Sequence, residues 1–156
     1  VVKHPKVNTT AQTPFDVAVG ELVVTELAPQ EPAWIELCNV SARTIEAGGL
    51  TIRTAGGSFE LPAGALAPGG CAAVCASSIA ACAFTAPVVL DPAADTVAVD
   101  MEGLALDAVT VDAAWSWTPG WVWSLDAAAT TPDGNDTVAA WCRTVGSPGE
   151  PNGTCG

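Results

Sequence analysis

The chain contains no tyrosine, one methionine and one histidine, and only five of its 156 residues are lysine or arginine. Against 17 aspartates and glutamates, these bases leave a formal charge of −12 at pH 7. Proteins that bind nucleic acid neutralise phosphates with lysine and arginine, so a nucleic-acid partner is not expected. The sequence has no apolar run of about 18 residues and no charged-then-apolar leader, so we expect a mature, soluble product without membrane insertion.

Candidates for nucleophilic catalysis are equally scarce. The single histidine, His4, lies in the N-terminal segment VVKHPKVNTTAQTPFD (1–16) together with both lysines, Lys3 and Lys6. A Ser-His-Asp or Cys-His arrangement needs an imidazole within hydrogen-bond reach of the nucleophile, and the chain has neither histidine nor lysine after residue 16. The Gly-Gly pair at 56–57 leads into a strand-like sequence rather than a helix, so no phosphate-binding loop is predicted. We expect a protein that is not an enzyme.

Apolar residues are abundant, at 49% of the chain against 14% charged, and this excludes a disordered chain. A length of 156 residues suits one domain with a sizeable core. Short segments rich in valine, isoleucine, leucine and threonine alternate with glycine and proline turns, which indicates an all-β fold. The one expected helical turn is ASSIAACA (76–83). The expected strands span 18–28, 33–40, 49–54, 58–61, 71–77, 88–90, 95–101, 104–112 and 121–126.

The order of these segments resembles a known family. Residues 20–70 contain GELVVTEL, AWIELCNV, LTIRTAGGSFELPAG and LAPGG in that order. The hairpin DTVAVDMEGLALDAVTVD (95–112) and the closing WCRTVGSPGEPN (141–152) continue the series. Over roughly 135 of its 156 residues the chain is similar to the lamin-tail domain family. The resemblance implies an immunoglobulin-like β-sandwich that serves as a non-catalytic module of a secreted or surface protein.

The resemblance also divides the chain. It implies a β-sandwich domain over 17–156, whereas residues 1–16 lack the family pattern and are expected to form an extended N-terminal arm. Pro5 and Pro14 disfavour a helix in this arm. A nuclear-scaffold role does not carry over, because the long coiled coil and basic segments that accompany the lamins' own tail do not occur in this sequence.

Paired carboxylates are the remaining candidates for acid–base chemistry. Glu26 and Glu36 fall on adjacent expected strands, where a separation like that of a glycosidase can occur. Both glutamates match strand positions of the lamin-tail pattern, so a structural role is preferred. In AWIELC (33–38), alternation places Ile35 and Leu37 on one face of a half-buried strand, with Glu36 on the other.

Six cysteines form an even set in a chain with one histidine, so the histidine ligands for a mixed Cys/His zinc site are scarce. Disulfides in an oxidising compartment are preferred, which implies a secreted or cell-surface protein. Six cysteines allow 15 connectivities. The preferred pairs, of which the last depends on an unseen sheet pairing, are Cys75–Cys82, Cys142–Cys155 and Cys38–Cys71.

All four asparagines, Asn8, Asn39, Asn135 and Asn152, begin an N-x-[ST] sequon. Glycosylation in surface loops is one interpretation of this pattern, and a glycoprotein would follow from it. The other interpretation is that asparagine simply falls in threonine-rich turns. The sequence leaves both open.

The loop PDGND (132–136), with Asp126 nearby, offers oxygen ligands of the type that Ca²⁺ prefers. It lacks the remaining spacing of an EF-hand. A solvated acidic turn is therefore preferred, and no metal or other cofactor is expected.

The segment WSWTPGWVWS (115–124) places Trp115 and Trp117 before a turn and Trp121 and Trp123 after it. If both halves are extended, each pair projects on one side. The four indoles then either cap the core or form an exposed aromatic platform of the kind found at interaction sites. The sequence leaves both open.

Two functions fit these features. The first is a secreted, non-catalytic structural protein, a self-assembling subunit of an extracellular filament or surface structure, whose arm adds to a neighbouring identical subunit. Its contact residues would be Val1, Val2, Lys3 and Val7. The sequence leaves open that the arm instead folds back on its own domain. The alternative is a carbohydrate-binding or adhesion module that holds a surface glycan with the tryptophan cluster.

Overall fold

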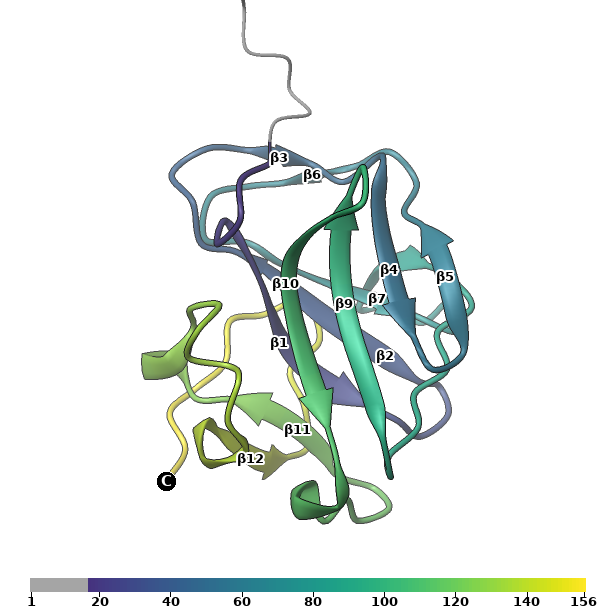
Figure 1. The fold of residues 1–156 in the computed structure, drawn as a ribbon, viewed down its shortest axis with the longest axis vertical. Helices are drawn as coiled ribbons and strands as arrows, with labels where there is room; N and C mark the ends of the chain where they lie inside the picture. Colours follow the sequence, from purple (N-terminus) through teal and green to yellow (C-terminus); the bar gives the residue numbers. More distant parts are fainter. Residues whose placement is uncertain (1–16) are drawn as a thin grey trace, which may run out of the picture.

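The computed structural model describes residues 17–156 as an almost entirely β structure (Figure 1). This confirms the expected all-β class. The expected arm, with Asn8 and the contact residues predicted in it, lies outside the described residues. The elements are β1 (Leu22–Ala28), β2 (Trp34–Asn39), β3 (Ile45–Glu46), β4 (Leu50–Thr54), β5 (Gly57–Glu60), β6 (Ala65–Leu66), β7 (Cys71–Cys75), β8 (Cys82–Thr85), β9 (Asp95–Met101), β10 (Leu104–Val111), β11 (Val122–Leu125) and β12 (Trp141–Thr144), with the 3-10 turns η1 (Ala113–Trp115), η2 (Ala127–Ala129) and η3 (Val138–Ala140).

The strands form two large sheets and one small one. The six-stranded sheet has the order β12-β11-β1-β2-β7-β8, and the four-stranded sheet has the order β10-β9-β4-β5. The strands β3 and β6 pair separately. Both large sheets contribute to one hydrophobic cluster, with Leu22 and Ile35 from the first and Ile52 and Val99 from the second, all fully buried. The core therefore lies between the two large sheets, as in a β-sandwich.

Strand positions agree best with the sequence where alternation is long. The strand over 95–101 is confirmed residue for residue as β9. The predicted strand at 88–90 and helical turn at 76–83 are both wrong, because residues 82–85 instead form β8, parallel to β7. Strand β8 buries Phe84 in the core, and this tertiary contact is not visible in the local sequence.

Strand β2 is buried on both faces, so its predicted half-buried character is wrong. Ile35 and Leu37 point into the main core, as alternation predicts. On the other face Trp34 packs in a second cluster with Val122 and other residues. The backbone at Gly146 packs directly on the Trp34 ring. A Cβ built at this position would lie 2.9 Å from the ring, and the φ of Gly146 is +80°, so glycine allows this close contact. The chain after β12 thus covers the outer face of the six-stranded sheet.

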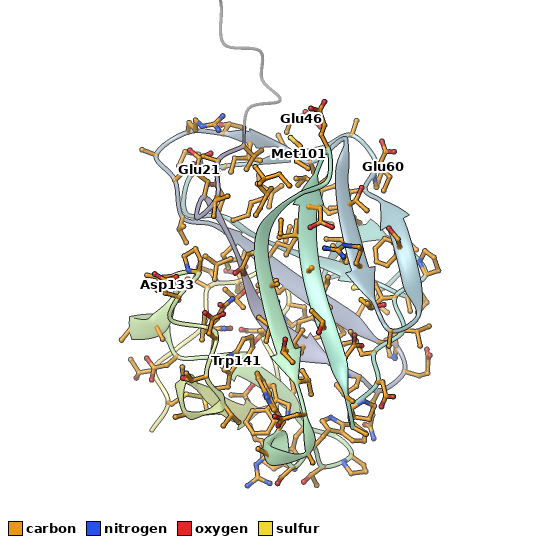
Figure 2. The ribbon with its side chains drawn as sticks, viewed as in Figure 1. Glu21, Glu46, Glu60, Met101, Asp133 and Trp141 are labelled. Carbon is orange, nitrogen blue, oxygen red and sulfur yellow. A yellow bond between two sulfur atoms is a disulfide. The ribbon has the colours of Figure 1, made fainter. Side chains whose placement is uncertain are left out.

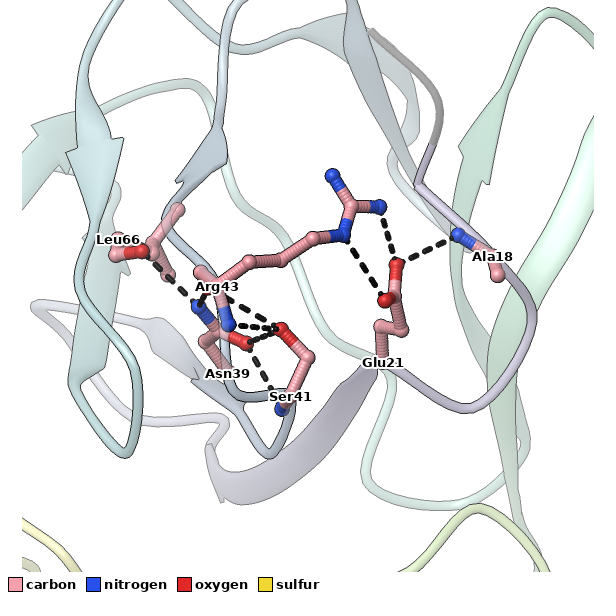
Figure 3. Close-up of polar contacts among 6 residues, drawn as sticks. All are labelled: Ala18, Glu21, Asn39, Ser41, Arg43 and Leu66. Carbon is pink, nitrogen blue, oxygen red and sulfur yellow. Dashed lines mark hydrogen bonds and ion pairs between the residues drawn. The ribbon is translucent and has the colours of Figure 1, made fainter. Parts of the chain in front are cut away.

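The chain enters the described region at one end of the sandwich. Figure 1 shows residues 17–21 beside β3 and β6, away from β11 and β12. Glu21 Oε2 accepts a hydrogen bond of 2.8 Å from the Ala18 amide, and the Arg43 guanidinium pairs with the same carboxylate (Figure 3). Glu46 and Met101 lie at this end too, whereas Trp141 lies toward the other (Figure 2).

Three disulfides join the pairs that were preferred from the sequence. Cys38–Cys71 links opposite residues of β2 and β7, which are antiparallel neighbours. Cys75–Cys82 closes the loop between β7 and β8, and Cys142–Cys155 ties β12 to the last residues of the chain. None of the helices within residues 17–156 has the length and apolar character needed to cross a membrane.

These three bonds predict the mass of the native protein. The intact mass measured under denaturing conditions should rise by six hydrogens, about 6 Da, when a reductant is added, because each disulfide takes up two hydrogens. Peptide mapping without reduction should recover the same three pairs. An unchanged mass after reduction would show that the thiols are free.

Candidate functional site

Two glutamates lie side by side on the outer face of the six-stranded sheet. Glu26 of β1 and Glu36 of β2 are partners in the antiparallel register, and both are fully buried. A β-bulge between Val24 and Glu26 precedes this pair. Like charges directly opposite one another destabilise a sheet. The pair therefore needs either hydrogen-bond donors or protons.

Glu26 receives its donors from two directions. Its Oε1 atom accepts hydrogen bonds from the Ser124 hydroxyl of β11 at 2.7 Å and from the Ser147 hydroxyl at 3.0 Å. The Ser147 amide lies 3.0 Å from Oε2. The neighbouring sheet strand and the C-terminal segment therefore hold this carboxylate together.

Glu36 is held in the same way. Its Oε1 atom accepts a 2.7 Å hydrogen bond from the Thr25 hydroxyl, and its Oε2 atom accepts one of 2.7 Å from the Gly149 amide. Residues 145–156, which we call the C-terminal clip, thus supply backbone donors to both glutamates.

The clip has further anchors of its own. Asn152 Nδ2 donates to the carbonyl oxygens of Thr25 at 2.9 Å and Leu125 at 3.0 Å. The Cys155 amide donates to Asp126 Oδ2 at 2.9 Å, next to the disulfide from Cys142. The clip is therefore fastened along its length to β1, β2 and β11.

Burial changes the acidity of the two glutamates. It raises the pKa of Glu36 to about 8; the hydrogen bond from Thr25 opposes this shift, and the charge of Glu26 adds to it. The carboxylate of Glu150, in the clip, raises the pKa of Glu36 further. Burial also raises the pKa of Glu26, against the hydrogen bonds from Ser124 and Ser147. Near neutral pH, Glu36 is mostly protonated, which relieves the repulsion within the pair.

A third buried carboxylate, Asp107 of β10, joins the two sheets. Its Oδ2 atom accepts 2.7 Å hydrogen bonds from the Val24 amide, at the bulge of β1, and from Asn135 Nδ2. Trp141 Nε1 donates to the Asn135 carbonyl oxygen at 2.9 Å. Burial raises the pKa of Asp107. No motif in the sequence marks Asp107, because its partners lie 28 and 83 residues away.

The three sequon asparagines within residues 17–156 have structural roles. Asn39 and Asn135 are fully buried. Asn39 Nδ2 donates to the carbonyl oxygens of Arg43 at 2.7 Å and Leu66 at 2.9 Å (Figure 3). A glycan is attached to this same nitrogen and needs an exposed site, so glycosylation at these two positions is not compatible with the fold. Asn152 uses its Nδ2 atom to hold the clip.

The tryptophan cluster divides between core and surface. Trp115 and Trp123 are buried and stack edge to face with ring centroids 5.3 Å apart, while Trp141 lies 5.2 Å from Trp115. Trp117 is half-buried, and Trp121 is 45% exposed. The predicted sidedness of the first pair is wrong, because Trp115 ends the 3-10 turn η1 and is not extended.

The loop at 132–136, for which the sequence favours a solvated acidic turn over a weak calcium site, does not bring its carboxylates into a group with metal-ligand spacing. Asn135 points into the interior, and Asp126 Oδ1 caps η2 by accepting from the Ala128 amide at 2.8 Å. Within the described residues, one cluster has the spacing of metal ligands, namely Glu36, Cys38 and Cys71, but its two sulfurs form a disulfide and carry no thiolate. The outer-face site therefore acts chemically as a hydrogen-bonded clamp.

Comparison with known proteins adds no relative: no family model, curated protein or solved structure matches the chain.

The raised pKa of Glu36 predicts a pH dependence of stability. Because the folded pKa lies above the unfolded value of about 4.5, the contribution is full below pH 4.5 and is lost as the pH rises through about 8. Between these limits the free energy of unfolding should fall by up to about 1.4 kcal/mol per pH unit. The measurement is urea unfolding at several pH values between 5 and 8.

Glu36→Gln should flatten this slope, since the amide resembles the neutral acid. Glu60→Gln, on the exposed strand β5, makes the same chemical substitution at a surface site and is the matched control. If Glu36→Gln and Glu60→Gln show the same slope as the unmodified protein, Glu36 does not titrate in this range.

Proposed function

We propose that the chain is a secreted, non-catalytic structural protein with a lamin-tail-like, immunoglobulin-like sandwich. In this proposal it self-assembles outside the cell, as a subunit of a filament or surface structure, through its N-terminal segment. The observation that carries the non-catalytic part is the clamp at Glu26 and Glu36. The oxygens of these two carboxylates are occupied by donors from Ser124, Ser147 and Gly149, although Glu26 also lines a hollow formed with the clip. Three disulfides and the absence of a membrane-crossing helix in residues 17–156 are consistent with an extracellular location.

Charge distribution supports self-assembly. Residues 1–16 hold both lysines and the only histidine, whereas residues 17–156 hold all but one of the 17 acidic residues and only three arginines. Two of these arginines already pair with carboxylates, Arg43 with Glu21 and Arg53 with Asp100. A basic segment of one copy is attracted to the acidic body of another, which speeds encounter and favours the contact.

Carbohydrate binding is the second candidate, and the exposure of Trp121 favours it. This ring is 45% exposed beside the half-buried Trp117, whose Nε1 donates to the Trp121 carbonyl oxygen at 3.2 Å. An exposed indole with an ordered neighbour is a surface on which a sugar ring can stack.

The size of the full-length chain in solution tests self-assembly. Sedimentation velocity should detect species larger than the 15.6 kDa chain, and electron microscopy should show extended particles. Exchanging both basic side chains in Lys3→Glu/Lys6→Glu should raise the concentration needed for assembly about tenfold or more, because the segment then repels the acidic body. A chain that stays monomeric at high concentration and low salt would refute the proposal.

The variants Trp121→Ala and Trp115→Ala distinguish the role of an exposed indole from that of a buried one. Trp115→Ala should cost about 3–5 kcal/mol of stability, because it empties the centre of a buried aromatic cluster. Trp121→Ala should cost less than about 1 kcal/mol. The unmodified chain and Trp121→Ala are also tested on a glycan array. If the unmodified chain binds a glycan and Trp121→Ala does not, the second candidate is favoured over self-assembly. If both chains bind equally, Trp121 is not part of a sugar site.

A further inference from the structure

An apolar cavity opens at one end of the sandwich, where β1 ends and β9 begins. Its free volume is about 20 Å³, which suits a group the size of a water molecule or the tip of an aliphatic side chain. A sugar ring is too large for it. The residues of this end cavity include Leu27, Pro29, Pro92, Val111, Trp117 and Trp123.

The surroundings of the end cavity are acidic. Asp91 and Asp95 take part in its wall, and Asp95 and Asp112 line a second, wider hollow beside it. Neither hollow has a lysine or arginine among its lining residues. An occupant that combines aliphatic side chains with positive charge would match both properties.

One polar group in the wall has no partner. Trp123 is 91% buried, since 9% of its surface remains exposed, and its Nε1 donor has no acceptor within residues 17–156. An unpaired buried donor costs about 1–3 kcal/mol. The Nε1 atom has less than 1 Å² of exposed surface, so a carbonyl acceptor reaches it only if the indole shifts when the cavity is filled.

The end cavity and the start of the described chain lie at opposite ends of the molecule. Strand β1 runs from Leu22, next to the Glu21–Arg43 pair, to Ala28, next to the cavity. Figure 1 shows the same polarity, with the end of β10 and the start of β9 far from residues 17–21. A segment that precedes residue 17 in one copy therefore leaves from the end opposite its own cavity.

We propose that the end cavity receives residues 1–16 of a second copy of this chain, with Val2 or Val7 inserted and Lys3, His4 and Lys6 facing the aspartates. This inference rests on the proposed self-assembly and names its acceptor site. Sixteen residues in extended form reach roughly 50 Å, enough to bridge adjacent copies. Because donor and acceptor lie at opposite ends, a head-to-tail contact leaves one free donor and one free cavity and can extend as a filament.

The test compares full-length variants by sedimentation velocity across a concentration series. Val111→Trp narrows the cavity, and its control Leu104→Trp places the same side chain at the exposed other end of β10. Val2→Asp/Val7→Asp disables the donor segment. Its control is Thr9→Asp/Gln12→Asp, which changes the charge of the segment by the same amount. Val111→Trp and Val2→Asp/Val7→Asp should each raise the concentration for assembly at least tenfold, and the two controls should change it less than about threefold.

Mixing the two defective variants separates a lost contact from a lost fold. Val111→Trp keeps its donor and Val2→Asp/Val7→Asp keeps its cavity, so an equimolar mixture should form a 1:1 dimer and nothing larger. If Val111→Trp assembled at the same concentration as the unmodified chain, the end cavity would not be the acceptor site. If Val2→Asp/Val7→Asp alone then failed to assemble, self-assembly would stand with a different acceptor. A monomeric unmodified chain would overturn both proposals.

Discussion

The buried pair of glutamates on the outer face of the six-stranded sheet is the interaction on which the rest of the structure depends. Two acids in register can be buried only if their oxygens find donors or protons. Ser147 and Gly149 bring backbone amides to Glu26 and Glu36, and the raised pKa of Glu36 removes one of the charges. The C-terminal clip and the burial of the pair therefore require each other. Without the clip, β2 would lose the cover of its second face.

The clamp also bears on where the molecule can act. It occupies the outer face of the six-stranded sheet, and the core occupies the space between the sheets. The outer face of the four-stranded sheet, the ends of the sandwich and the sheet edges remain for contacts. One end carries the Glu21–Arg43 pair, beside which the chain enters the described region. The other carries Trp121, the end cavity and several aspartates. A module with two different ends suits a role that depends on neighbours.

Local patterns predicted much of the fold. The strand over 95–101 follows from alternation, and Cys75–Cys82 follows from a short loop. What was missed depends on contacts distant in sequence. Strand β8 pairs with β7 and buries Phe84 in the core, and the sequon at Asn39 proves to be a buried amide with carbonyl partners. The donors to the glutamates include the backbone amides of Ser147 and Gly149, which no residue type reveals. The clamp itself could therefore be predicted only as a carboxylate pair of structural role.

The rate of amide hydrogen exchange in the C-terminal clip tests the clamp most directly. The amides of Ser147, Gly149 and Cys155 donate to Glu26, Glu36 and Asp126, although they lie outside any strand. Such amides exchange their hydrogen with solvent only when their hydrogen bonds break. NMR at neutral pH should find these three amides protected to nearly the degree of the β2 amides. Exchange at the rate of an unstructured peptide would contradict the clamp and the cover it provides.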